Sequence, residues 1–584
     1  MKDILRLCLL SILSFLFFTP VGAQQLTVTV DSVGQLATQL PDSVRFTMSE
    51  LKVCGPLNGT DLKLIQQIAN RTKAKKPGEA VLTAINLSEI TIQESRGGVR
   101  TKENQLPGDL FSGCKALESV ILPNSITEVS RGCFSNCSAL KEVEIPEGVT
   151  AIGDNAFSKC SALEEIKLPR QLSSIGKSAF NGCTNLRSIR LPETIAQLGS
   201  QAFTGCNQLE QIDFENCVIT LIDNGVFSGC ERLSEIVLPK SVQKIENDAF
   251  KKCTALEKVE TSTPVEEIDN SAFEGCTSLQ EIDLTGVTRI GSDAFKECAS
   301  IKNIEMERLK RMGSGAFEKC ANLSSVSVEG ALDAIATDAF RDCSSLSDIS
   351  LPSSVKTIGT RAFKSCKSLR EIEMPSSLTR INDNAFEDCA SLRFVHIPSQ
   401  VKQLGSDAFR DCTSLDSVHV QGFIDKIEDD VFRNCHSLRV VVLPVSVKSI
   451  DSSAFEECAS LRSINLPISL TSISDEAFSR CTSLTQIVIP AGCTSIGSSA
   501  FRECSGLKRV ELPATIKKIG GHAFAKCVSL SELVCGAPIP PNIASSTFKG
   551  VSSYSFRVVV PNGAKNNYRN DKQWSKLSLI VEAQ

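Results

Sequence analysis

One segment of about 23 residues repeats along most of this chain. The motif Phe-x-x-Cys occurs nineteen times between Phe111 and Cys527, with a step of 23 residues except for one step of 24 and two of 22. A fixed period in this range indicates stacked structural units that bury their apolar faces against one another. The repeat therefore predicts a single long solenoid, although 584 residues would otherwise suggest three or four domains.

Each copy contains the pattern of a short strand. In one copy Val143 and Ile145 alternate with Glu142 and Glu144, a period of two that is typical of a strand with one buried face. Pro146 follows, and eleven other copies have a proline at this point, where its missing N–H would break a ladder hydrogen bond. One strand per coil, stacked on its neighbours, predicts a parallel sheet.

Two further elements are expected in each coil. Val149–Gly153 predicts a second short extended segment, in which the glycine allows the chain to turn. Asp154–Phe157 predicts a single helical turn with an Asp or Asn cap. The apolar positions predict a repeat core that comprises Phe157, Cys160, Leu163, Ile166, Leu168, Phe180 and Cys183.

The recurring pattern AFxxCxSLxxIxLPxSVxxIG resembles the BspA-type leucine-rich repeat of secreted and surface proteins in Bacteroides-like bacteria. The resemblance covers about Leu110 to Cys535. It implies a leucine-rich-repeat solenoid, a right-handed β/α coil of about 20 stacked repeats of 23 residues. Its parallel sheet would form the concave face, with short extended segments and helical turns elsewhere and a cap at both ends.

The flanks resemble the caps of the same family. Leu51–Ala69 and Leu82–Ile92 are similar to a degenerate N-terminal repeat with its helix. At the other end, Phe548, Tyr568 and Trp574 are expected to cover the last coil, whose core and sheet edge would otherwise be exposed. The expected domains are residues 1–23 (signal peptide), 24–106 (N-terminal cap), 107–535 (solenoid) and 536–584 (C-terminal cap).

The first residues are typical of a cleaved secretory signal. Basic Lys2 and Arg6 precede the mainly apolar run 7–18, and small residues precede Gln24. The run of 12 residues is shorter than the roughly 20 that span a bilayer. Cys8 lies within the run and not at the cleavage site, so no lipoprotein anchor is expected. We therefore expect a protein that is secreted or located at the cell surface or in the periplasm, with no transmembrane segment in the mature chain.

The column of repeat cysteines allows two interpretations. Coils about 4.8 Å apart would bring equivalent Cα atoms within disulfide range, and an exported protein can keep disulfides. However, parallel Cα–Cβ vectors also leave the Cβ atoms about 4.8 Å apart, beyond the usual 3.5–4.5 Å. We therefore expect a small apolar side chain whose weak S–H donor reaches a buried carbonyl.

Neither the composition nor the motifs indicate an enzyme or a nucleic-acid-binding protein. The net charge is −5, which gives no basic excess for nucleic acid or an anionic bilayer. The chain has four histidines and lacks the C-x-x-C, H-E-x-x-H and P-loop motifs. Paired carboxylates are plentiful and are what glycosidases need, but they arise readily on a repeating surface. We expect no enzyme, no catalytic residue and no cofactor.

The outward strand positions change character along the chain. They are mainly acidic in the first two-thirds, as at Glu142, Glu144, Glu371 and Glu373, and then become apolar and imidazole-bearing in three successive coils. The candidate partner-binding residues in these coils are Phe394, His396, His419, Val440 and Val442. An exposed apolar patch rimmed by charge is typical of a contact surface, although strands also favour such residues for their own stability.

His396 and His419 are 23 residues apart and are expected to be stacked neighbours. A metal site there would need more ligands than the sequence shows, so none is expected.

Family resemblance also implies a function. It indicates an exported, adhesin-like binding protein that recognises a protein partner, on host matrix, host cells or other bacteria, through its concave sheet. The alternative is a non-adhesive envelope scaffold or a glycan-capture protein. The ligand, the mode of surface attachment and the oligomeric state stay open, because a fold does not determine a function.

Overall fold

A computed structural model of the chain describes residues 24–552, 556–577 and 579–583. The expected signal peptide, residues 1–23, lies outside the described residues. The chain forms two compact units, Met1–Ile212 and Asp213–Gln584. Within the described ranges no helix is long and apolar enough to cross a membrane.

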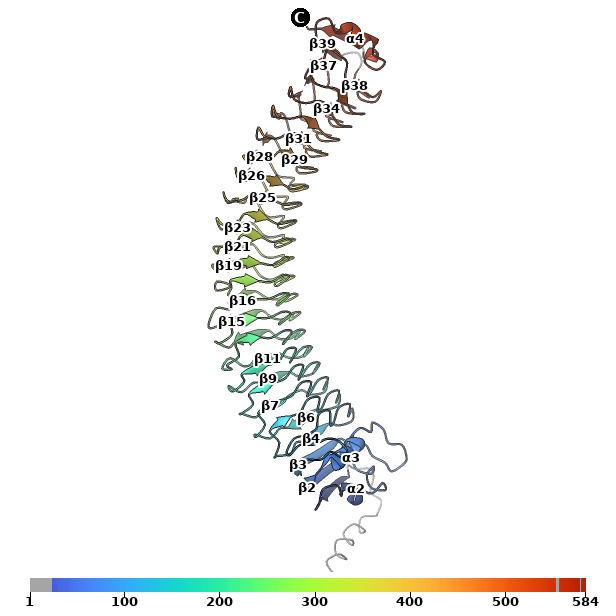
Figure 1. Cartoon of the computed structure of the whole chain (residues 1–584), viewed down its shortest axis with the longest axis vertical. Coiled ribbons are helices and arrows are strands. Elements are labelled where there is room, and N and C mark those ends of the chain that lie inside the picture. Colours follow the sequence, from blue (N-terminus) through green and yellow to red (C-terminus); the bar gives the residue numbers. More distant parts are fainter. Residues whose placement is uncertain (1–23, 553–555, 578, 584) are drawn as a thin grey trace, which may run out of the picture. The chain divides into compact units, whose positions relative to one another are not determined.

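Most coils contribute a first strand to a parallel ladder, and the strands of successive coils lie side by side within each unit (Figure 1). The coils around Ile166, Ile372 and Ile464 have no assigned strand at this point. In the first unit these strands are β1 (Gln25–Thr29), β2 (Glu50–Leu57), β3 (Ala84–Ile92), β4 (Ser119–Ile121), β6 (Glu142–Glu144) and β9 (Ser188–Arg190), and β11 (Gln211–Asp213) lies at the division. In the second unit they are β13 (Glu235–Leu238), β15 (Lys258–Thr261), β17 (Glu281–Ile282), β19 (Asn303–Met306), β21 (Ser325–Val328), β23 (Asp348–Ser350), β26 (Phe394–Ile397), β28 (Ser417–Val420), β30 (Val440–Val442), β33 (Gln486–Val488), β35 (Arg509–Leu512), β37 (Glu532–Cys535), β39 (Arg557–Val560) and β40 (Leu579–Glu582).

A second ladder consists of two-residue strands, one from each repeat coil. In the first unit it comprises β5 (Glu128–Val129), β7 (Ala151–Ile152), β8 (Ser174–Ile175) and β10 (Gln197–Leu198). In the second unit it comprises β12 (Leu221–Ile222), β14 (Lys244–Ile245), β16 (Glu267–Ile268), β18 (Arg289–Ile290), β20 (Arg311–Met312), β22 (Ala334–Ile335), β24 (Thr357–Ile358), β25 (Arg380–Ile381), β27 (Gln403–Leu404), β29 (Lys426–Ile427), β31 (Ser449–Ile450), β32 (Ser472–Ile473), β34 (Ser495–Ile496), β36 (Lys518–Ile519) and β38 (Asn542–Ile543). The chain is therefore the expected parallel solenoid with little helix.

The segment around each repeat phenylalanine differs from the expected helical turn. Asn155 and Lys159, on either side of Phe157, have left-handed backbones with φ of 55° and 61°. Alternate N–H groups donate to carbonyls of the next coil, as from Phe157 to Ala179 (2.8 Å), while the residues between them donate three residues back. The expectation of a helical turn is wrong, because hydrogen bonds between coils replace the bonds along a helix.

The glycine after the second strand also acts differently from expectation. Gly153 has no positive φ. A Cβ atom there would lie 2.6 Å from the backbone nitrogen of Arg131 in the preceding coil. The residue allows a close approach between coils and does not provide a left-handed turn.

The repeat phenylalanines form a stack inside each unit. In the first unit the rings of Phe111 to Phe203 have centroids 5.3–5.4 Å apart. In the second unit the rings of Phe227 to Phe548 are 5.1–5.7 Å apart and nearly parallel. Each ring inside the stack packs against two others, so an inner coil depends on both of its neighbours.

All described cysteines are free thiols. In seventeen coils, from Cys137 to Cys527, the thiol donates to the carbonyl oxygen of the phenylalanine one coil back, over 2.9–3.3 Å. Burial raises the pKa of Cys206 to about 12, which keeps the reactive thiolate scarce at neutral pH. The cysteine column is therefore structural, with the weak hydrogen bond that the sequence predicts.

Six of the residues that we assigned to the repeat core are buried: Phe157, Cys160, Leu163, Ile166, Phe180 and Cys183. Leu168 is only half-buried, which corrects the prediction for this residue. Ile145 and Leu351 are half-buried at the same point of their coils. All three precede a proline, but Leu191 and Ile397 also precede a proline and are buried, so the proline alone does not explain the exposure.

The N-terminal end contains two helices, α2 (Leu36–Gln39) and α3 (Gly59–Ala69). Asn58 and Asp61 form a capping box at the start of α3. The buried Asp61 carboxylate also accepts hydrogen bonds from the N–H groups of Gly34 (2.7 Å) and Leu36 (3.0 Å). This carboxylate joins the starts of both helices through backbone donors.

At the C-terminal end, helix α4 (Lys565–Asn570) and the 3-10 helix η1 (Trp574–Lys576) pack beside the last strands. Tyr568 and Trp574 are fully buried. The Tyr568 hydroxyl donates to the carbonyl oxygen of Ala537 (2.7 Å), and Trp574 Nε1 donates to that of Pro541 (2.8 Å). The Trp574 ring lies 6.0 Å from the Phe548 ring, so these aromatics cover the end of the phenylalanine stack.

Candidate partner-binding surface

Three adjacent strands bring the candidate binding residues together. Strand β26 pairs with β28, and β28 pairs with β30, near the labels β26 and β28 in Figure 1. Phe394 lies opposite Ser417, which lies opposite Val440. In the next column His396 lies opposite His419, which lies opposite Val442. We call Phe394, His396, His419, Val440 and Val442 the apolar strand patch.

The side chains of the apolar strand patch point to solvent. Phe394 is 55% exposed, Val440 51% and Val442 44%, and both histidines are exposed. The alternate residues Val395, Val418 and Val441 are buried. The period-two pattern of each strand thus separates a constant interior from a variable surface.

Charged and polar residues border the patch along the same strand face. Glu371 and Glu373 are exposed in the coil before β26, and Ser463 and Asn465 are exposed in the coil after β30. The apolar strand patch is therefore bordered by polar outward residues on both sides, and Val488 on β33 is a further exposed apolar residue of this face (55%).

A row of exposed arginines lies just before the strands of the patch. These residues are Arg370, Arg393, Arg439 and Arg462. Arg439 pairs with Asp416 at 3.5 Å. Within the described part of the chain no ion pair involves Arg370, Arg393 or Arg462. The guanidinium groups give one side of the patch a positive rim.

A second group of exposed apolar side chains lies in the loops after the strands. Phe423, Val445 and Ile468 are 75%, 77% and 79% exposed. Sequence reasoning missed them, because we considered only strand positions. A signal existed: Val445 and Ile468 follow the strand-ending proline, a position that is polar in the first eight copies that have this proline. We call these three residues the loop apolar group.

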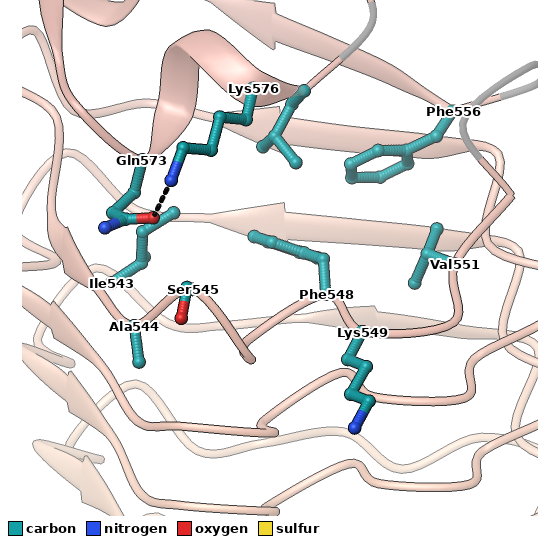
Figure 2. Close-up of a pocket in the computed structure, with 10 residues that line it drawn as sticks. Ile543, Ala544, Ser545, Phe548, Lys549, Val551, Phe556, Gln573 and Lys576 are labelled. Atoms are coloured by element: carbon teal, nitrogen blue, oxygen red, sulfur yellow. Dashed lines mark hydrogen bonds between the residues drawn. The ribbon is translucent and has the colours of Figure 1, made fainter.

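The C-terminal cap contains a small pocket of about 260 Å³ (Figure 2). Phe548 and Phe556 form its apolar wall, and the side chains of Lys576 and Gln573 hydrogen-bond to each other at its rim (3.2 Å). Typical ligand sites have volumes of about 300–1,000 Å³ and several convergent polar groups. The pocket has the character of a packing gap at the end of the phenylalanine stack.

A wider depression of about 530 Å³ lies near the N-terminal end of the repeats. Arg100, Lys102 and Arg131 line it together with Glu128. Gln105 donates a hydrogen bond to the Glu128 carboxylate, which engages the one acidic group in the lining. All three basic residues are exposed, and the buried Ser130 hydroxyl in the lining donates to the carbonyl oxygen of Leu106 (2.5 Å), so the depression is a solvated basic surface.

We searched the described residues for a metal site. No group of three or more His, Cys, Asp or Glu side chains in the described ranges is placed to hold a metal ion. The repeat thiols are buried and hydrogen-bonded.

Comparison with known proteins identifies the repeat. The sequence model described as "BspA type Leucine rich repeat region (6 copies)" matches residues 104–230, 220–347, 310–439 and 425–555. These matches overlap and together cover most of the chain. No curated protein matches it.

Solved structures with similar repeats include a leucine-rich repeat protein from Bacteroides ovatus ATCC 8483, with 26% sequence identity over 74% of this chain and 88% of the other, and a TM-score of 0.30. A leucine-rich cell surface protein from Faecalibacterium prausnitzii A2-165 has 23% identity over 60% of this chain and 86% of the other, with a TM-score of 0.34. At these TM-scores the similarity carries no argument about function.

Proposed function

Because the chain belongs to the BspA-type leucine-rich repeat family, we propose that it is an exported binding protein that recognises a protein partner through the apolar strand patch. The proposal includes adhesion, to host matrix, host cells or other bacteria, as its most specific form. Family membership supports a scaffold that presents side chains on a long repeated surface. The choice of partner then depends on the few outward positions that differ from coil to coil.

One observation carries the proposal: three paired strands expose Phe394, Val440 and Val442 in register beside two imidazoles. Neighbouring coils have Glu371 or Asn465 at the outward positions of the same face. Soluble proteins rarely leave contiguous apolar patches exposed unless these contact something. Aromatic residues surrounded by polar groups are typical of the centre of a protein interface.

The surroundings of the patch indicate the chemistry of the partner. Arg393 and Arg439 lie at one side, and the loop apolar group lies beyond the strand ends at the other. A protein segment with an apolar centre and carboxylates along one edge would complement both features. Guanidinium groups suit carboxylates because they can donate two parallel hydrogen bonds.

Binding of the chain from Gln24 onward to arrays of matrix proteins and glycans tests the proposal. The variant Phe394→Ala/Val440→Ala removes apolar area from the patch and leaves both histidines in place. The matched control Glu142→Ala/Glu144→Ala alters two exposed outward positions on β6 of the first unit. Circular dichroism of each variant checks that it folds.

We expect saturable binding to a protein that the patch variant loses and the control keeps. Equal binding by both variants would contradict the use of the patch. Binding that free sugars compete away would favour the glycan-capture alternative, and no binding to either array would favour a non-adhesive envelope scaffold.

A further inference from the structure

His396 and His419 face each other across adjacent strands of the apolar strand patch. Their backbones are directly opposite in the β26–β28 ladder. Their ring centroids lie 5.2 Å apart, and the ring planes are nearly perpendicular at 81°. Both side chains are exposed, so the rings can turn about χ2 without displacing the core.

This separation matches what a metal ion requires of two imidazole ligands. In a tetrahedral zinc site with Zn–N bonds of about 2.0–2.1 Å, the centroids of two bound imidazoles are about 5 Å apart. The phenylalanine rings of successive coils repeat at a similar 5.1–5.7 Å, so the spacing of the two imidazoles is that of the coils. The backbone therefore holds the two ligands at a suitable distance before any ion binds, which lowers the cost of binding.

The surroundings of the pair also suit a cation. Hydrogen bonding of Arg393 N–H to the Arg370 carbonyl (3.0 Å) sets the register with the preceding coil. Three residues further along, this register places exposed Glu373 one coil before His396 in the same outward column. A carboxylate one coil away favours a bound cation electrostatically.

We propose that His396 and His419 form a two-imidazole site for a divalent transition metal ion of the zinc type, whose open coordination positions accept a donor group from the bound partner. Imidazole nitrogen suits Zn²⁺, Cu²⁺ and Ni²⁺ better than Mg²⁺ or Ca²⁺. The chain supplies two protein ligands, and water fills the other positions until a carboxylate or imidazole of the partner replaces it. The second half of this proposal rests on the proposed binding function, whereas metal binding itself does not.

The other two histidines provide a matched control. His436 is exposed, and its Nδ1 lies 2.9 Å from the carbonyl oxygen of Glu457. His522 has a left-handed backbone with φ of 60°, which Asn tolerates. The variants His396→Ala/His419→Ala and His436→Ala/His522→Asn therefore each remove two of the four histidines of the chain.

Isothermal titration calorimetry with Zn²⁺, and separately with Ni²⁺, tests the site in the chain from Gln24 without a polyhistidine tag. All proteins also carry Cys54→Ser, because Cys54 is the one described cysteine that is not buried and its thiol would compete for the metal. We expect one saturable site in the parent and in His436→Ala/His522→Asn, and loss of that site in His396→Ala/His419→Ala. Equal metal binding by both double variants, or none by the parent, would overturn the proposal.

Partner binding with and without a chelator tests the coordination by the partner. We expect chelation to weaken partner binding by the parent and to leave the residual binding of His396→Ala/His419→Ala unchanged. No effect on the parent would overturn this half of the proposal. Failure of the binding function is distinguishable, because a protein that binds no partner would still bind Zn²⁺ in the titration.

Discussion

The coil that contains β6 in the first unit and the coil that contains β28 in the second are built alike and present different surfaces. Val143 and Val418 are both buried, and each coil has a phenylalanine in its stack. The outward residues are Glu142 and Glu144 in β6, but Ser417 and His419 in β28. The comparison teaches that stacking constrains the inward positions of every coil and leaves the outward positions free to differ.

The contrast between inward and outward residues has a simple physical cause. An inward side chain contacts the coils before and after its own, so a change in its volume disturbs two interfaces. An outward side chain contacts mainly water, and its replacement typically changes stability by less than about 0.5 kcal/mol. Binding specificity can therefore vary along the chain without loss of the fold.

Removing one ring from the stack tests the difference between inward and outward positions with the largest expected effect. Phe386 is fully buried between Phe363 and Phe409, at 5.2 Å from each. We expect Phe386→Ala to destabilise its coils by about 3–5 kcal/mol, because the cavity cannot close without moving two neighbours. Hydrogen exchange of peptides from residues 380–412 measures this loss of protection.

The control for this substitution is Phe394→Ala, because Phe394 is exposed and lies in the neighbouring coil. We expect the free energy of opening, measured by hydrogen exchange, to match that of the parent within about 0.5 kcal/mol. Similar losses of protection in both variants would contradict the division between inward and outward positions.

Removing one thiol donor would have a smaller effect. Cys412 Sγ donates to the carbonyl oxygen of Phe386 over 3.2 Å, and this oxygen also accepts the N–H of Cys389. We expect Cys412→Ala to cost about 1–2 kcal/mol, because one weak hydrogen bond and some packing are lost while the carbonyl keeps a partner.

Labelling of the neighbouring Cys389 and Cys435 by a thiol reagent, followed by mass spectrometry, measures how often the coil opens in Cys412→Ala. These thiols are fully buried in the parent, so faster labelling indicates local opening. The exposed Ser414→Ala is the control and should label like the parent. Unchanged labelling of Cys389 and Cys435 in Cys412→Ala would show that the thiol hydrogen bond contributes nothing.

The smallest expected effect concerns a surface ion pair and its dependence on pH. Hydrogen bonds from Lys526 (2.8 Å) and Arg480 (3.2 Å) lower the pKa of Glu503 below its ordinary value, although partial burial opposes this. A carboxyl group whose pKa is lower in the folded state stabilises the fold above the unfolded pKa of about 4.3, and this contribution is lost as the pH falls through the folded pKa.

We therefore expect Glu503→Gln to lower the thermal midpoint slightly at pH 7. As the pH falls below about 4, the midpoint of the variant should approach that of the parent. Circular dichroism melts at pH 7, 5 and 3 measure this difference. The exposed strand residue Glu144 provides the control Glu144→Gln, which should show no comparable convergence. A constant difference between Glu503→Gln and the parent at all three pH values would contradict the assignment.

The predictability of the fold follows from its repetition. The period places Phe157 and Phe180 in equivalent surroundings, so a single copy suffices to predict the stack, and the same holds for Cys160 and Cys183. Alternation within Phe394–Ile397 also shows which side chains leave the core. The loop apolar group escaped prediction because loop residues have no such alternation, and its signal at Val445 and Ile468 appears only when the position after the proline is compared between copies.

The turn around each phenylalanine was predicted wrongly for a different reason. Gly, Asn or Asp occupies many of its left-handed positions, as at Gly132 and Asn155, but residues such as Arg361 occupy others, so the glycine and asparagine signature is incomplete from copy to copy. Their conformation is stabilised by hydrogen bonds to the next coil, which local propensity does not encode.

The sequence by itself determined the repeated interior, the strand register and the structural role of the cysteines, because a constant period makes each coil the template for the next. Only the tertiary structure decided the left-handed turns, the half-exposure of Leu168 and the perpendicular approach of the His396 and His419 rings. These features depend on hydrogen bonds and packing between residues of different coils or at strand ends, and such contacts exist only once the coils have stacked.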